Sequence, residues 1–224
     1  YKHFIPKQIP CAKEHGYFTF AGLWGDVRLI GKSATHIQDV FVQPDIHRKK
    51  INVLVETSSP TDLKLEIIGT RQQVCGEPGK LTLPFPDCEL WSPENPALYS
   101  LQCTALRDEQ AVDQVEVRFG MREFTVKENR FYLNNRPIFV KGVLHQPDYP
   151  LSLACPISPE MARQEIEAAK RAGFNLIRLH IKTAPRITLD LCDEIGLMVY
   201  EEPPIGWIQT SPYMRERCER EVRE

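Results

Sequence analysis

Apolar and polar residues alternate along residues 35–120, and the alternation predicts a series of short β-strands. The apolar residues of three such runs are Ile51, Val53 and Val55, then Leu63, Leu65 and Ile67, then Val115, Val117 and Phe119. A period of two residues places the side chains of each run on one face, which is the pattern of half-buried strands. Segments rich in turn formers, such as SSPTD and EPGK, separate the runs. Roughly seven short strands over about 85 residues fit an immunoglobulin-like β-sandwich.

The pattern changes after residue 120, where turn formers interrupt short apolar runs. Turns at Lys127–Asn129 and Asn134–Asn135 predict a hairpin. The apolar run PIFVKGVLH, residues 137–145, follows the hairpin. We expect this run to be the first buried strand of a new unit.

Residues 158–202 predict the order helix, strand, helix, strand. Ser158 is a good N-cap with Pro159 at the first helical position, and Gly173 and Gly196 stop the two helices. The apolar positions of the helices are Ala162, Ile166 and Ala169 in the first, and Ile187, Leu191 and Ile195 in the second. The runs NLIRLHI and LMVYEE predict the second and third strands. Strands that alternate with helices indicate a parallel α/β sheet.

A parallel sheet is normally covered on both faces, and the helices predicted here leave much strand surface open. A closed (β/α)8 barrel takes about 250 residues, whereas residues 121–224 supply about 100. We therefore expect either the N-terminal part of a truncated barrel or a sheet whose open edge something else covers. The open edge also predicts that the chain self-associates as a homo-oligomer or is only marginally stable.

Residues 1–34 form a separate short region in front of the sandwich. The segment GYFTFAGLWGDVRLIGK carries aromatic residues, glycines and a final apolar run. A region of this length is too short to bury a core alone. Either it packs on the next domain, or it is the end of a larger domain whose beginning lies upstream.

Composition is that of an ordinary globular protein, with 42% hydrophobic and 26% charged residues. The net charge of −2 and the absence of a long basic run argue against a nucleic-acid partner. The apolar stretches are far shorter than the roughly 20 residues of a membrane helix, so we expect no membrane partner. Seven cysteines without CxxC spacing argue against zinc and against a full disulfide framework. They favour a reducing compartment such as the cytoplasm.

Five segments together resemble glycoside hydrolase family 2, the family of β-galactosidases, β-glucuronidases and β-mannosidases. They are AGLWGDVRLIG, LWSPENPALYSL, FYLNNRPIFVKGV, GFNLIRLHI and LDLCDEIGLMVYEEPP. The resemblance implies the end of a jelly-roll sugar-binding-like domain at 1–34, an immunoglobulin-like β-sandwich at 35–120, and the N-terminal part of a TIM-barrel catalytic domain, a (β/α)8 barrel, at 121–224. Gly25 and Asp26 depart from the family pattern in the first segment, and Asn135 and Arg136 depart from it in the third.

The chemistry of this family is retaining hydrolysis by two glutamates, an acid/base in an N-E pair on the fourth barrel strand and a nucleophile on the seventh. Neither motif occurs in the chain, so we predict no catalytic residue here. Glu201 and Glu202 are neighbours on a predicted strand, so their side chains point to opposite faces. A retaining pair stands roughly 5 Å apart on one substrate, which these two cannot do. A pair of Asp148 with Glu202 is geometrically feasible but is not favoured.

The resemblance implies a sugar-binding role for residues at the ends of the second and third strands. Arg178 matches the family arginine that holds active-site carboxylates, and a structural ion pair inside the barrel is the alternative. His180 shares a strand face with Arg178 and resembles the variant R-x-H-I-K; a core histidine is its alternative. Glu202 matches the glutamate of the family D-E pair, with a buried ion pair, for example to Arg178, as the competing interpretation.

Three further residues in loops are candidates of lower rank. Asp148 falls where some members bind sugar hydroxyls, although GVLHQPDYP departs from the commoner G-V-N-R-H-E, and a solvated loop aspartate is the alternative. His145 in the same loop is similar and weaker. Trp207 is a candidate stacking platform for a sugar ring or else a packing residue, as we expect for Trp91 in the sandwich. Magnesium-binding members carry a Glu and a His where this chain has PPIGWIQ, so we predict no metal, and no cofactor is implied.

Two functions follow from these observations. The first is a part of an exo-acting retaining β-glycosidase, β-galactosidase-like, that hydrolyses terminal β-linked sugars and whose catalytic glutamates lie outside this chain. The second is a non-catalytic module that binds carbohydrate or protein. In both, the predicted partner is a carbohydrate or a protein surface, and the sugar-binding candidates are Asp148, Arg178, His180, Glu202 and Trp207.

Overall fold

The computed structural model describes residues 27–146, 149, 151–152, 155–180, 183–202 and 212–223. Two compact units divide the chain, and we call Arg28–Phe139 the sandwich unit. The second, the α/β unit, contains Val140–Glu224. Most of the predicted jelly-roll end lies outside the described residues, and the domain boundaries given above stay a prediction.

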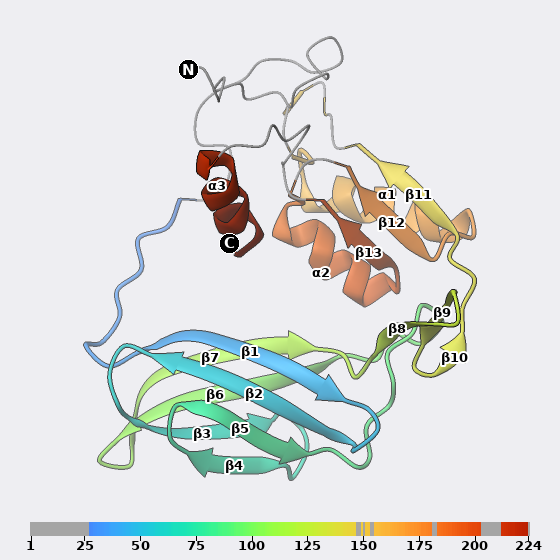
Figure 1. The fold of residues 1–224 in the computed structure, drawn as a ribbon. Helices are drawn as coiled ribbons and strands as arrows, with labels where there is room; N and C mark the ends of the chain where they lie inside the picture. The colour runs from blue at the N-terminus through green and yellow to red at the C-terminus, as the bar shows by residue number, and fades with distance from the viewer. Residues whose placement is uncertain are drawn as a thin grey trace. The chain divides into compact units, whose positions relative to one another are not determined.

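The sandwich unit contains the expected run of short strands. They are β1 (Ile37–Asp45), β2 (Lys50–Thr57), β3 (Asp62–Ile67), β4 (Gln73–Gly76), β5 (Gly79–Pro84), β6 (Tyr99–Arg107) and β7 (Gln110–Phe119). Antiparallel pairing arranges them in two sheets, β1–β2–β5 and β4–β3–β6–β7, which form two layers (Figure 1). The predicted immunoglobulin-like sandwich is thereby confirmed.

The apolar residues that alternate along these strands are the ones buried in the sandwich core. Val53 and Leu65 are fully buried on their strands, as are Leu101 and Cys103 on β6. The intervening residues point outward, as Leu54 does with 42% of its surface exposed. One continuous core therefore fills the space between the two sheets.

Trp91 is a packing residue of the sandwich unit, as expected. Its side chain is completely buried, and the Arg122 guanidinium lies 4.6 Å from its ring centroid. Its backbone N–H donates to the Met121 carbonyl at 2.9 Å. A Cβ at Gly120 would stand 3.1 Å from the Cβ of Trp91, a tighter contact than most Cβ atoms make, so glycine suits this close approach.

A small sheet of β8 (Phe124–Lys127), β9 (Arg130–Leu133) and β10 (Arg136–Pro137) follows the sandwich. Its turns lie where the sequence predicted them, and Glu128, Asn129, Asn134 and Asn135 all have positive φ. Such pairs of left-handed residues give two-residue turns the twist that strands need. Asn134 also ties this sheet to the sandwich, because its Nδ2 donates to the Trp91 carbonyl at 2.9 Å.

The α/β unit contains the predicted alternation of strands and helices. Its elements are β11 (Gly142–His145), α1 (Pro159–Arg171), β12 (Leu176–Leu179), α2 (Arg186–Ile195), β13 (Met198–Glu201) and α3 (Pro212–Arg223). The strands pair in parallel in the order β11–β12–β13 (Figure 1). The sheet of the described residues is open, which agrees with the start of a TIM barrel.

Helix ends in this unit follow the sequence signals. The Ser158 side chain accepts from the backbone N–H of Met161 at 3.2 Å, and Pro159 begins α1. Gly173 and Gly196 both have φ of +86°, a conformation that glycine adopts at low cost after a helix. These caps fix where each helix ends and the next strand begins.

The core of the α/β unit lies on one face of its sheet. Val143, Ile177 and Val199 stand side by side on the three paired strands. They pack with residues of the two helices, which are Ala162 and Ile166 of α1 and Leu191 and Cys192 of α2. The helices therefore cover this face of the sheet.

Two expectations about this unit were wrong. The run at 137–145 is not a buried strand, since β11 begins only at Gly142, and Phe139 and Leu144 are 81% and 49% exposed. The reason is that β11 is an edge strand of the described sheet and has helices on one face only.

In α2 the buried positions are Thr188, Leu191 and Cys192, whereas Ile187 is 37% exposed. Leu191 is buried as predicted and Ile195 packs against the core, so the predicted apolar face is wrong only at Ile187. Ile187 fits the spacing to Leu191 and Ile195, but the helix turns its neighbour Thr188 toward the core instead.

Candidate functional site

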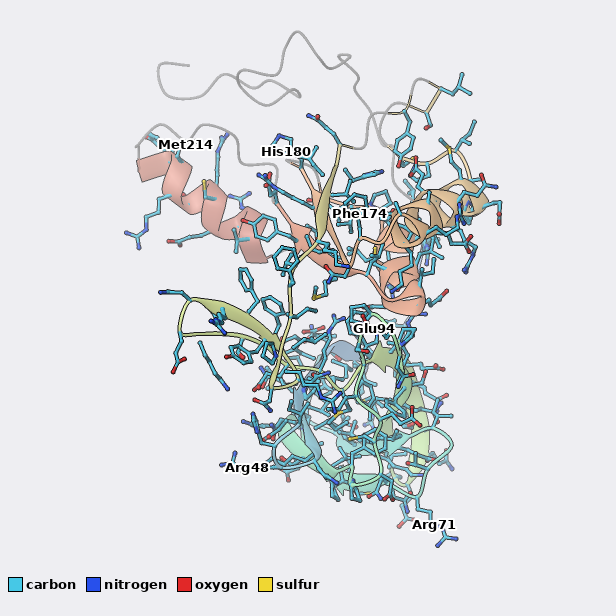
Figure 2. The ribbon with its side chains drawn as sticks, turned by 90° about the vertical axis from the view of Figure 1, so that its right-hand side faces the viewer. Arg48, Arg71, Glu94, Phe174, His180 and Met214 are labelled. Atoms are coloured by element: carbon cyan, nitrogen blue, oxygen red, sulfur yellow. The ribbon has the colours of Figure 1, made fainter. Side chains whose placement is uncertain are left out.

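The face of the α/β sheet opposite the helices carries the residues predicted from the strand ends. Leu144, Arg178 and Tyr200 stand side by side there on β11, β12 and β13. Tyr200 is 56% exposed, and its ring centroid lies 5.8 Å from Cζ of Arg178. Because residues two apart share a strand face, His180 and Glu202 follow Arg178 and Tyr200 toward the carboxyl ends of the strands. Figure 2 labels Phe174 and His180, which lie before and after β12.

Glu202 brings Arg178 and His180 together. Nε of Arg178 donates to Oε1 of Glu202 at 2.6 Å, and Nη2 of Arg178 contacts the same oxygen. Nδ1 of His180 donates to Oε2 of Glu202 at 2.9 Å. Each carboxylate oxygen therefore binds a different partner, and we call these three residues the strand-end cluster.

Burial differs among the members of the strand-end cluster. The side chains of His180 and Glu202 are 17% and 18% exposed, whereas that of Arg178 is 46% exposed. A partly buried carboxylate with two basic partners is well stabilised, so Glu202 fixes the orientations of Arg178 and His180. The exposed guanidinium and the second ring nitrogen of His180 are the groups of the cluster suited to hydrogen bonding with a ligand.

Glu201 points to the opposite face of the sheet, as predicted for a strand neighbour of Glu202. Its Oε1 accepts from the backbone N–H of Ala184 at 2.8 Å. Ala184 precedes α2, whose N-cap Pro185 makes no side-chain cap hydrogen bond. Glu201 thus holds the entrance to α2, and the two glutamates cannot face one glycosidic bond together.

A second polar cluster lies between the end of β11 and α1. Oε2 of Glu165, on α1, accepts from the Tyr149 hydroxyl at 2.8 Å and lies 3.5 Å from Nε2 of His145. Sequence reasoning named only His145 of these three residues, and only as a weak candidate. No local signal marks Tyr149 or Glu165, because their contact joins residues from a loop and a helix.

Two sequence candidates, Asp148 and Trp207, lie outside the described residues, so their roles stay predictions. Among the residues that the structure does describe, no group of three or more His, Cys, Asp or Glu side chains could hold a metal ion. None of the helices within the described ranges is long and apolar enough to cross a membrane.

Family models match nearly the whole described chain. The model of glycosyl hydrolases family 2 matches residues 35–122, and the model of the TIM barrel domain of the same family matches residues 124–223. The chain belongs to glycosyl hydrolases family 2. The first family 2 match covers the sandwich strands, and the second begins at β8 and runs into α3.

Curated relatives within family 2 are glucuronidases and galactosidases. A putative β-glucuronidase of Formosa agariphila is 28% identical over 214 residues, which cover 88% of this chain and 20% of that protein. A β-glucuronidase of Streptococcus agalactiae is 26% identical over 86% of this chain and 33% of its own length. A β-galactosidase of Oenococcus oeni is 26% identical over 86% of this chain and 21% of its own. The chain thus spans about a fifth to a third of these relatives.

Solved structures share the fold of this chain. β-Glucuronidase 3 of Bacteroides uniformis aligns with a TM-score of 0.77 at 25% identity, covering 92% of this chain and 28% of that one. A β-galacturonidase of Eisenbergiella tayi, solved with galacturonate, aligns with a TM-score of 0.72 at 24% identity. That alignment covers 86% of this chain and 38% of the other, and it shows the common fold.

Proposed function

We propose that this chain is part of an exo-acting retaining β-glycosidase that hydrolyses terminal β-linked sugars. The observation that carries the proposal is the strand-end cluster, in which Glu202 holds Arg178 and His180 at the carboxyl ends of parallel strands. Enzymes with barrels of this kind place their sites at that end of the strands. The names of the relatives, β-glucuronidase and β-galactosidase, support a pyranoside substrate.

In this proposal the cluster binds sugar and does not carry out the chemistry. Glu202 is engaged by two basic side chains and keeps them in place, while Arg178 and His180 donate or accept hydrogen bonds with sugar hydroxyls. Asp148 and Trp207 join the same site, the first as a hydroxyl acceptor and the second as a stacking platform. The acid/base and the nucleophile come from outside these 224 residues.

The first experiment measures sugar binding to the 224-residue chain by NMR. Galactose, glucuronate and their methyl β-glycosides are titrated to high millimolar concentration while the Arg178 Nε and His180 ring signals are followed. We expect saturable shifts of these signals. Absence of any shift with all four sugars would reject a sugar site at the strand-end cluster.

A matched pair of variants makes this experiment specific. Glu202→Gln removes the charge that holds both basic residues, and we expect it to weaken sugar binding about tenfold, the effect of losing a charge-assisted hydrogen bond. Glu201→Gln is the same chemical change on the opposite face, and its amide oxygen still accepts from Ala184. It should bind sugar as the unchanged chain does, and equal weakening by both variants would contradict the assignment.

A second experiment tests where the catalytic residues lie. The 224-residue chain is incubated with aryl β-galactosides and aryl β-glucuronides, and released phenol is measured. We expect no turnover above the rate in buffer. Robust hydrolysis would overturn the placement of the catalytic glutamates outside this chain, whereas sugar binding without turnover agrees with the proposal.

A further inference from the structure

Tyr149 connects the segment after β11 to helix α1. Its side chain is 5% exposed, and its hydroxyl donates to Oε2 of Glu165 at 2.8 Å. Burial, and then the neighbouring Glu165 carboxylate, raise the pKa of Tyr149, so the hydroxyl keeps its proton and remains a donor. Another hydrogen bond in this segment runs from the Ser152 hydroxyl to the Cys155 carbonyl.

His145 joins this contact to the strand-end cluster. It is the last residue of β11, and its Nε2 lies 3.5 Å from the same Glu165 oxygen that Tyr149 reaches. Its backbone carbonyl accepts from the backbone N–H of His180 at 3.0 Å. The last residue of β11 therefore contacts α1 through its side chain. Through its backbone it binds His180, which in turn contacts Glu202.

We propose that Tyr149 and Glu165 are positioning residues for the sugar site, which they serve by fixing the segment after β11 against α1. This inference rests on the proposed function. Val143 and His145 share the sheet face that the helices cover. Glu165 belongs to α1 and contacts His145 and Tyr149 on that side. The effect of Tyr149 and Glu165 on a ligand is therefore indirect and passes through the backbone that leaves β11.

The sequence places this anchor close to the site. Tyr149 comes directly after Asp148, the proposed hydroxyl acceptor, and four residues after His145. Restricting such a short segment before a ligand arrives lowers the entropy lost on binding. A free segment would have to be ordered by the sugar itself, which weakens the apparent affinity.

The test compares three variants with the unchanged chain. Tyr149→Phe keeps the buried ring and removes only the hydroxyl, and Glu165→Ala removes the acceptor. Glu165→Gln keeps an oxygen that can accept from Tyr149, so it should restore the behaviour that Glu165→Ala loses. Tyr213→Phe is the control, because Tyr213 is 68% exposed on α3.

Two readouts keep this inference apart from the proposed function. Hydrogen exchange of amides in residues 146–157, measured without sugar, should be roughly tenfold faster in Tyr149→Phe and Glu165→Ala than in the unchanged chain, Glu165→Gln or Tyr213→Phe. The Kd for the sugar that binds, measured by NMR, should rise roughly tenfold in the same two variants.

Each outcome decides one of the two claims. Unchanged exchange in Tyr149→Phe would overturn the anchoring, whether or not the chain binds sugar. Faster exchange with an unchanged Kd would overturn the positioning role and leave the sugar site standing. A chain that binds no sugar but shows faster exchange would reject the proposed function and, with it, the role in positioning a sugar, while the anchor itself would remain.

Discussion

The two units of this chain differ in how completely their strands are covered. In the sandwich unit, two sheets bury each other, and residues such as Val53, Leu65 and Leu101 are fully enclosed. In the α/β unit, helices cover one face of the sheet, while Leu144 and Tyr200 remain about half exposed on the other. The polar strand-end cluster lies on that exposed face.

This difference distinguishes an enclosed apolar core from an exposed polar face. Apolar side chains occupy the inner faces of the sandwich, and its core positions offer no group to a ligand. The face of the α/β sheet that no described helix covers instead presents an arginine, a histidine and a tyrosine beside a partly buried carboxylate. The sheet of the described residues is also open at its edges, which agrees with the start of a barrel.

The largest expected effect comes from the sandwich core. Leu65→Ala deletes a fully buried side chain from β3, and we expect the free energy of unfolding to fall by about 3 kcal/mol because the enclosed site cannot collapse fully. Urea unfolding followed by tryptophan fluorescence measures the loss. The control Leu54→Ala, at a position 42% exposed on β2, should cost less than about 1 kcal/mol. Equal losses would contradict the enclosed core.

A smaller effect is expected in how fast the buried cysteines of the two cores react. Cys103 in the sandwich and Cys192 in α2 are both fully buried, and burial raises their pKa values to about 11 and about 12. Labelling of either thiol therefore requires an opening of its core. We expect maleimide to label Cys192 at least about tenfold faster than Cys103, because the described residues of the α/β unit cover only one face of its sheet.

Mass spectrometry of peptides from the folded protein measures both labelling rates. Cys75, which is exposed, provides the rate for an accessible thiol. Labelling of Cys103 as fast as that of Cys192 would show that the two units open equally readily.

The smallest effect concerns acid stability of the sandwich. Burial alone would raise the pKa of Asp113, but hydrogen bonds from the backbone N–H groups of Ile37 and Gln114, together with Lys32, outweigh it and hold the pKa below its usual 3.8. A carboxyl whose pKa is lowered by folding stabilises the folded state at pH values above its unfolded-state pKa. That stabilisation is lost as the pH falls through the folded-state pKa.

Asp113→Asn should therefore lower the free energy of unfolding by about 1 kcal/mol at neutral pH. The difference from the unchanged chain should shrink as the pH falls below 3.8. Urea titrations across this range measure it, with Asp62→Asn, at the exposed start of β3, as the control. A difference that persists unchanged into acid would show that the charge of Asp113 is not what stabilises the sandwich.

Local signals in the sequence predicted the elements of both units well. Period-two alternation found the sandwich strands, and Ser158 and Gly173 marked the ends of α1. The error at 137–145 has a clear physical cause. An apolar residue in the sequence does not reveal whether a partner element covers it, and in the α/β unit one sheet face has no such partner among the described residues.

The members of the strand-end cluster were predictable because the family resemblance marked Arg178 and Glu202, and strand spacing added His180 on the face of Arg178. Residues two apart on β12 share a face, and Glu202 follows the neighbouring parallel strand. The contact between Tyr149 and Glu165 was not predictable, since it depends on how a loop folds back onto a helix. Long-range packing of this kind leaves no spacing pattern in the sequence.

The core of the sandwich is built from one uninterrupted stretch, Ile37 to Met121. During translation, this stretch has left the ribosome well before β12 and β13 are synthesised, and at about 5–20 residues per second the interval lasts several seconds. Small domains fold faster than that. We therefore expect the sandwich to form co-translationally, before the parallel strands that follow are complete.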